Sequence, residues 1–237
     1  MAIFAVAVAS EANAQVSIVA IYGGGNPDGG WTSSSTANNL QLALRGKLRD
    51  SGSVPWSPGN IYNFPGGPSL LNSARSSVNW EFSINSDVSG SGLTNLLAFN
   101  YRISVDTDPT AGLSWTVFNP LTTYSDNSLG TNATTNGSGL EDNIYAGRNI
   151  AQNSENMAFL PFAAGAGITG IYDFRLQAFS LTDTDFVSPI AEVQVRLNIG
   201  VPSTTAVPEP STYGLIGAAA LIGLIATRRI RGKSSKA

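Results

Sequence analysis

Residues 78–85 read VNWEFSIN, and this stretch decides the fold class. Apolar side chains occupy every second position, at Val78, Trp80, Phe82 and Ile84, and polar residues stand between them. Successive side chains of a β-strand point to opposite faces of the sheet. The run therefore predicts a strand with one face on a core and the other face, which carries Glu81, in water.

The same alternation recurs along the chain and predicts one all-β domain. Residues 97–105, 172–178 and 193–199 show it clearly, and 16–22, 40–48, 112–118 and 157–162 show it more weakly. Glycine-rich and polar segments, such as 23–38, 51–73 and 125–143, separate these runs. Seven to nine strands of this kind predict a single antiparallel β-sandwich, jelly-roll or immunoglobulin-like, over residues 15–200.

Composition excludes several classes of function. The 237 residues include no His and no Cys, which removes disulfides, hydrolases of the Ser-His-Asp type and His-based zinc enzymes. The formal net charge is −3, and five of the 13 basic residues lie after residue 227, so the body is more acidic than the whole chain. An acidic body argues against nucleic-acid binding, which needs a basic face.

The N-terminal residues, MAIFAVAVASEANAQ, have the pattern of a signal peptide. An apolar run at 2–9 is followed by small residues at Ala12 and Ala14, which predicts a signal peptide over 1–14 and cleavage between Ala14 and Gln15. The positively charged start of a leader is missing, and we interpret the segment as truncated. The alternative is a short N-terminal strand.

The C-terminal residues predict a membrane anchor. Residues 213–226 are all apolar or Gly, and as a helix they reach about 20 Å, against a hydrocarbon core of about 30 Å. Basic residues follow at Arg228, Arg229 and Arg231 and should stay in the cytoplasm. We expect a short transmembrane helix at 213–227, a cytoplasmic tail at 228–237 and the body outside. A buried core helix is the alternative.

Pro208, Glu209 and Pro210, the apolar stretch and the terminal Arg cluster together resemble the PEP-CTERM sorting signal of Gram-negative bacteria. The resemblance covers about residues 207–233. It implies recognition by a membrane-embedded exosortase near the Pro-Glu-Pro step, an inner-membrane anchor before processing, and then a place at the cell surface or in the extracellular matrix. Residues 201–212, in which the two prolines disfavour helix, then form a linker.

The body is also similar to an uncharacterised family of PEP-CTERM exported proteins. This resemblance rests on the motifs NPDGGW, LQLALR with the following Lys47, DTDPTAG, DNSLG, IAQNSENMAF and IYDFRLQAF, which cover much of residues 26–199. It implies one domain and no particular activity.

Two weak patterns suggest ligand sites. Asp106 and Asp108 could ligate Ca²⁺, the one cofactor that the sequence suggests, although a turn capped by Asp is the alternative. Trp31 and Trp56 lie in or near expected loops and could stack on sugar rings, although packing at a sandwich end is the alternative.

Acidic residues on the expected strands suggest a third candidate site, a catalytic one. Glu81 with Asp173 or Glu192 could form the carboxylate pair of a glycan hydrolase, because two acids at a suitable distance suffice for that chemistry. Each also lies at an outward position, where a solvated charge or a cross-strand partner for an Arg is the alternative.

The sequence thus predicts an exported, non-enzymatic surface or matrix protein whose partners are an exosortase, the membrane and exopolysaccharide. Two alternatives remain at this point: a carbohydrate-binding module for exopolysaccharide, and a carboxylate-based glycan hydrolase.

Overall fold

A computed structural model describes residues 14–57, 60–92, 94–159, 161–162 and 165–201 of the chain. The predicted linker, transmembrane helix and basic tail lie outside these residues, except for Val201, and so does the predicted signal peptide, except for Ala14. Within the described part, no helix has the length and apolar character needed to cross a membrane.

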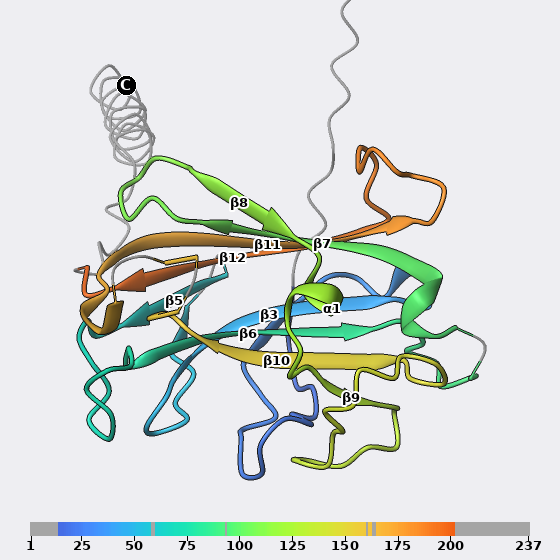
Figure 1. Ribbon diagram of the computed structural model, residues 1–237, viewed down its shortest axis with the longest axis horizontal. Coiled ribbons are helices and arrows are strands. Elements are labelled where there is room, and N and C mark those ends of the chain that lie inside the picture. Colours follow the sequence, from blue (N-terminus) through green and yellow to red (C-terminus); the bar gives the residue numbers. More distant parts are fainter. Residues whose placement is uncertain (1–13, 58–59, 93, 160, 163–164, 202–237) are drawn as a thin grey trace, which may run out of the picture. The chain divides into compact units, whose positions relative to one another are not determined.

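The first sheet has six antiparallel strands in the order β1-β2-β3-β6-β10-β9 (Figure 1). The stretch VNWEFSIN forms β6, and its neighbours are β3 and β10. The bounds are β1 Ala14–Val16, β2 Trp31–Ser33, β3 Gln41–Leu48, β6 Val78–Asn85, β10 Ile150–Asn156 and β9 Ser128–Gly130.

The second sheet also has six strands, in the order β4-β5-β12-β11-β7-β8. All of its pairs are antiparallel except β5 with β12, which run parallel. The bounds are β4 Trp56–Ser57, β5 Ile61–Phe64, β12 Ala191–Ile199, β11 Gly170–Ser180, β7 Phe99–Asp106 and β8 Trp115–Phe118.

In the part of the chain that the structure describes, helix is confined to short connections. These are α1 at Pro120–Thr123 and three 3-10 turns at Ala37–Asn39, Leu96–Ala98 and Gly165–Gly167. The Leu96–Ala98 turn shortens one predicted strand, since the Asn95 side chain caps it and β7 begins only at Phe99. Two of the weaker strand predictions are wrong in part. The pattern over 16–22 predicts a strand, but β1 ends at Val16, and in the range 157–162 residues 157–159 form a turn.

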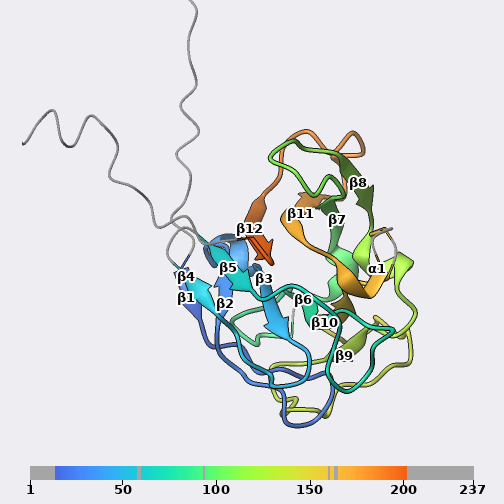
Figure 2. The ribbon, with the colours of Figure 1, turned by 90° about the vertical axis from the view of Figure 1, so that its left-hand side faces the viewer.

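The main core lies between the two sheets, and the predicted β-sandwich is confirmed (Figures 1 and 2). The alternating apolar residues of β6 meet those of β11, and the rings of Trp80 and Phe174 lie 5.1 Å apart. Gly46 on β3 leaves room for this packing, because a Cβ there would come within 2.6 Å of the Phe64 ring. Burial of these faces is the main stabilising term of the domain.

A second layer of packing covers the outer face of the first sheet. Residues 17–30 run across this face, and the side chain of Gln152 on β10 holds them by accepting from Ile21 N at 2.8 Å and donating to Val19 O at 2.9 Å. Ala20, Tyr22 and Trp31 pack there against Ala43. The β3 and β6 strands are therefore buried on both faces.

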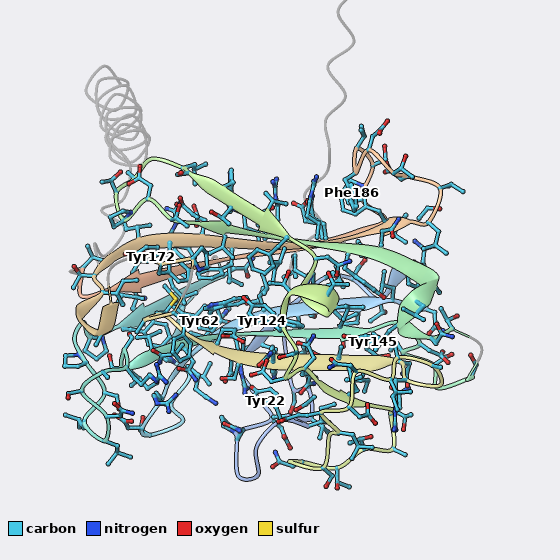
Figure 3. The ribbon with its side chains drawn as sticks, viewed as in Figure 1. Tyr22, Tyr62, Tyr124, Tyr145, Tyr172 and Phe186 are labelled. Atoms are coloured by element: carbon cyan, nitrogen blue, oxygen red, sulfur yellow. The ribbon has the colours of Figure 1, made fainter. Side chains whose placement is uncertain are left out.

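This covering overturns the prediction that Glu81 is a solvated charge. Its side chain is fully buried, because residues 17–30 replace water on that face. In Figure 3, Tyr22 lies on the far side of the first sheet, whereas Tyr124 lies between the two sheets. A charge placed in such a layer needs partners of opposite charge.

Candidate functional site

A cluster of ionised side chains surrounds Glu81. Antiparallel register places Arg45 of β3 opposite Glu81 of β6, and Lys47 lies two positions further along β3 on the same face. Arg45 Nε lies 2.5 Å from Glu81 Oε2, and Lys47 Nζ lies 2.6 Å from Glu81 Oε1. Two cations thus hold one carboxylate, in a layer from which water is excluded.

Neutral donors complete the shell of the carboxylate. Tyr22 donates its hydroxyl hydrogen to Glu81 Oε2 at 2.5 Å, and Ser154 donates to Oε1 at 2.7 Å. Burial alone would raise the pKa of Glu81, but the charges of Arg45 and Lys47 and these hydrogen bonds outweigh it and hold the pKa below its usual value. Burial raises the pKa of the Tyr22 hydroxyl, so Tyr22 remains a donor.

The same cations fasten the loop of residues 23–30 to the sheet. Arg45 donates to the backbone oxygens of Pro27 at 2.8 Å and Gly29 at 2.5 Å, and its guanidinium carbon lies 4.1 Å from the centre of the Trp31 ring. Lys47 donates to the side-chain oxygen of Asn26. The NPDGGW motif therefore covers the Glu81 cluster, and two of its backbone carbonyls accept hydrogen bonds from the cluster.

Sequence reasoning missed this cluster. A signal for it existed, because Arg45 and Lys47 stand two residues apart in a strand that is otherwise apolar, and two cations on one face of a strand need an acid nearby. The identity of that acid depends on strand pairing, which a single sequence does not display.

The proposed sugar-stacking pair does not form a site. Trp31 is 0% exposed within β2, so the prediction for this residue is wrong, and its ring packs on Arg45 instead. Trp56 lies in β4, in the other sheet, and is half-buried against the main core. The alternation over residues 112–118 also predicts a core position for Trp115, and this is wrong: Trp115 lies on the outer face of the second sheet, with the centre of its ring 5.2 Å from the Arg175 guanidinium carbon.

The side chains of Asp106 and Asp108 stabilise the turn between β7 and β8. Asp106 Oδ1 accepts from the backbone nitrogens of Asp108 at 3.1 Å and Ser114 at 2.8 Å, and Asp108 Oδ1 accepts from Thr110 N at 2.9 Å. These contacts are those of a self-capped turn. Within the described ranges, no group of three or more acidic residues is placed to hold a metal ion.

The acids proposed for a hydrolase lie on opposite sides of the molecule. Glu81 faces outward from the first sheet, and Asp173 and Glu192 face outward from the second. Asp173 forms a two-pronged ion pair with Arg196 at 2.8 Å for each contact, which confirms the alternative of a cross-strand partner. The proposed acid pair is therefore wrong.

Another carboxyl has an altered acidity on the inner face of β10. Burial, and then the nearby charge of Asp126, raise the pKa of Glu155 to about 7. Its neighbour Asn153 donates to Asp126 Oδ1 at 3.0 Å. Burial, and then the charge of Glu155, raise the pKa of the Tyr124 hydroxyl. Glu155 is thus partly protonated near neutral pH.

A polar pocket of about 320 Å³ lies where β6 ends and β10 begins. Its walls come from three segments of the chain: Asp87, Gly90, Gly92, Thr94 and Asn95; Thr131, Asn132 and Ala133; and Gly147, Arg148 and Asn149. Two of the lining residues are hydrogen-bonded to each other: Asn149 donates to Asn132 Oδ1 at 2.8 Å, and Asn132 donates in turn to Asp87 O at 2.8 Å. Arg148 supplies the cation, and its nearest acid, Asp142, lies 3.7 Å away. The amide, hydroxyl and guanidinium groups of the lining can thus donate and accept hydrogen bonds.

Comparison with protein families matches residues 206–231 to the PEP-CTERM protein-sorting motif. The chain carries a PEP-CTERM sorting motif. No curated protein and no solved structure gave a match to the chain.

The PEP-CTERM motif covers the residues that the sequence analysis singled out at this end. Pro208, Glu209 and Pro210 lie within the match, as do Arg228, Arg229 and Arg231. All six lie outside the described residues. The PEP-CTERM motif implies export, membrane anchoring before cleavage and an interaction with an exosortase during processing.

The predicted cleavage site at the other end falls at β1. Ala14 and Gln15 pair with Ser33 and Thr32 of β2. The alternative of a short N-terminal strand is thus present from Ala14 onward. Cleavage between Ala14 and Gln15, which stays a prediction, would leave Gln15 and Val16 to pair with β2.

Proposed function

We propose that residues 14–201 form a non-enzymatic β-sandwich that is displayed at the cell surface or in the extracellular matrix, in association with exopolysaccharide. The PEP-CTERM motif carries this proposal, because it makes the protein an exported substrate of an exosortase. The chemistry of the body agrees with it. The chain has no His or Cys, and the Glu81 carboxylate is already paired with Arg45 and Lys47 and shielded from solvent.

Fractionation of cells that produce the intact protein tests this proposal. We expect recovery in the envelope or the medium, in a form that has lost its C-terminal segment, and retention of the longer form in the inner membrane of cells without an exosortase. A full-length product in the cytosol would contradict the proposal. A cytosolic protein expressed in parallel controls for leakage.

Carbohydrate binding is a second candidate function, and the polar pocket favours it. A volume of about 320 Å³ lies at the lower end of the range for small-molecule sites. Hydroxyl-rich ligands are held by planar amides, hydroxyls and guanidinium groups, and Asn95, Thr94 and Arg148 offer these at the pocket wall. In this proposal the pocket, and not the pair Trp31 and Trp56, is the sugar-binding site.

Substitution of Arg148 by alanine tests this second candidate. We expect about tenfold weaker binding to the polysaccharide of the producing cells, since one charge-assisted hydrogen bond contributes roughly 1.5 kcal/mol. Affinity electrophoresis in gels containing the polysaccharide measures the change. Arg75→Ala is the matched control, because Arg75 lies before the start of β6, whereas the pocket lies after its end. Equal mobility of all three proteins with and without polysaccharide would exclude the pocket as a sugar site.

A further inference from the structure

Lys47 has an unusual position for a lysine. It is the only lysine between residues 14 and 201, and its side chain is 5% exposed. Its Nζ donates to Asn26 Oδ1 and lies 2.6 Å from Glu81 Oε1, and it also faces the Tyr22 ring at 5.4 Å from the centre. A nearly buried amine, a partly buried carboxamide and a fully buried carboxylate thus meet at one point.

The carboxamide of Asn26 is held in one orientation. Its Nδ2 donates to the backbone oxygens of Tyr22 at 2.9 Å and Gly23 at 2.7 Å, which leaves Oδ1 directed at Lys47. Groups held in contact in this way react as if at effective concentrations of about 10⁵ to 10⁸ M. A slow reaction of the amine with the amide therefore becomes accessible over the lifetime of the folded protein.

The carboxylate of Glu81 is placed to move protons between the two. Arg45 and Tyr22 hold Oε2, so Oε1 remains directed at Lys47 and Ser154. A carboxylate in contact with an ammonium can take its proton and expose the nucleophilic lone pair. The same group can then return the proton to a leaving group.

We propose that Lys47 and Asn26 form an intramolecular isopeptide bond, with Glu81 as the catalytic proton carrier. Glu81 takes a proton from the Lys47 ammonium, and the free amine attacks Cγ of Asn26. A second proton passes from Nζ to Nδ2, the Cγ–Nδ2 bond breaks, and ammonia leaves. The proton on Glu81 is released with the ammonia as ammonium, so the products are a secondary amide, ammonium and the original carboxylate.

The bond would join the loop of residues 23–30 covalently to β3. A chain without Cys cannot form a disulfide, and an isopeptide bond supplies an equivalent link that needs no oxidant. Such a link suits a protein that functions outside the cell, because it keeps the covering layer closed over the Glu81 cluster.

Tryptic digestion of the full-length protein recovered from producing cells tests the proposal directly. Trypsin normally cuts after Arg45, Lys47 and Arg49. With the bond in place, Lys47 resists cleavage, and we expect residues 46–49 joined through Lys47 to the peptide that contains Asn26 and ends at Arg45. Tandem mass spectrometry would find this branched peptide lighter by one ammonia than the sum of its parts. Cleavage after Lys47, together with an intact Asn26, would overturn the proposal.

Three variants separate the roles of the residues. Lys47→Arg and Glu81→Gln are expected to yield no branched peptide, whereas Asn26→Asp can still react by loss of water and give the same product. Asn136→Ala is the matched control, since Asn136 donates to the backbone oxygen of Asn26 at 2.8 Å but takes no part in the reaction. A branched peptide in Glu81→Gln at the wild-type level would exclude Glu81 as the proton carrier. If a variant fails to fold, the digest of the wild-type protein still shows whether the isopeptide bond is present.

Discussion

Substitution of Glu81 by alanine lowers the free energy of unfolding by about 3–5 kcal/mol, because it leaves Arg45 and Lys47 buried without a counter-charge. This is a large part of the 5–15 kcal/mol that stabilises a typical domain. Urea denaturation of the full chain, followed by tryptophan fluorescence, measures the change. Trp31 reports on the cluster itself, since its ring packs against Arg45.

Glu141→Ala is the matched control for this prediction. Glu141 is exposed, and its removal should change the free energy of unfolding by no more than about 0.5 kcal/mol. A change of similar size for Glu81→Ala would show that the cluster is open to water in solution, which contradicts the buried arrangement. Should Glu81→Ala give no soluble protein, Glu81→Gln keeps the shape of the side chain and carries the same comparison.

Replacement of Pro208, Glu209 and Pro210 by alanine is expected to abolish processing of the C-terminal segment. The three residues lie within the matched sorting motif, and alanines in their place favour helix where the prolines prevent it. We therefore expect the exosortase to recognise the altered segment poorly. An immunoblot of the envelope fraction should show only the longer form of the protein.

Ser234→Ala with Ser235→Ala is the control for processing, because both residues lie beyond the matched range. This variant should be processed as the wild type is. Processing of the triple variant at the wild-type rate would show that the enzyme reads another part of the segment.

The sequence predicts much of the sandwich because its strong strands have one apolar face each. Alternation placed β6, β11 and β12 well, since the residues that pack between the sheets recur at every second position. The short strands β1, β2, β4 and β9 have two or three residues each and give no periodic signal. Of these, β2, β4 and β9 each pair with a longer neighbour, namely β3, β5 and β10.

The Glu81 cluster could not be predicted in the same way. Alternation tells which residues share a face, but it does not tell whether another segment covers that face. Residues 17–30 cover it through contacts such as Gln152 with Ile21, which lie 131 positions apart in the chain. The predictions that Glu81 is solvated and that Trp31 is free to stack on a sugar are wrong for this one reason, because the local sequence pattern does not show the covering segment.

The position of β12 determines when the domain can be completed. This strand is the last one described, yet it lies inside its sheet, between β5 and β11. A polypeptide that emerges from a secretion channel with its N-terminus first can pair β5 with β4 and β11 with β7, but each of these two strands keeps one unpaired edge until β12 has crossed. The second sheet is therefore completed only at the end of such a passage, and the pairing that joins its two halves forms last.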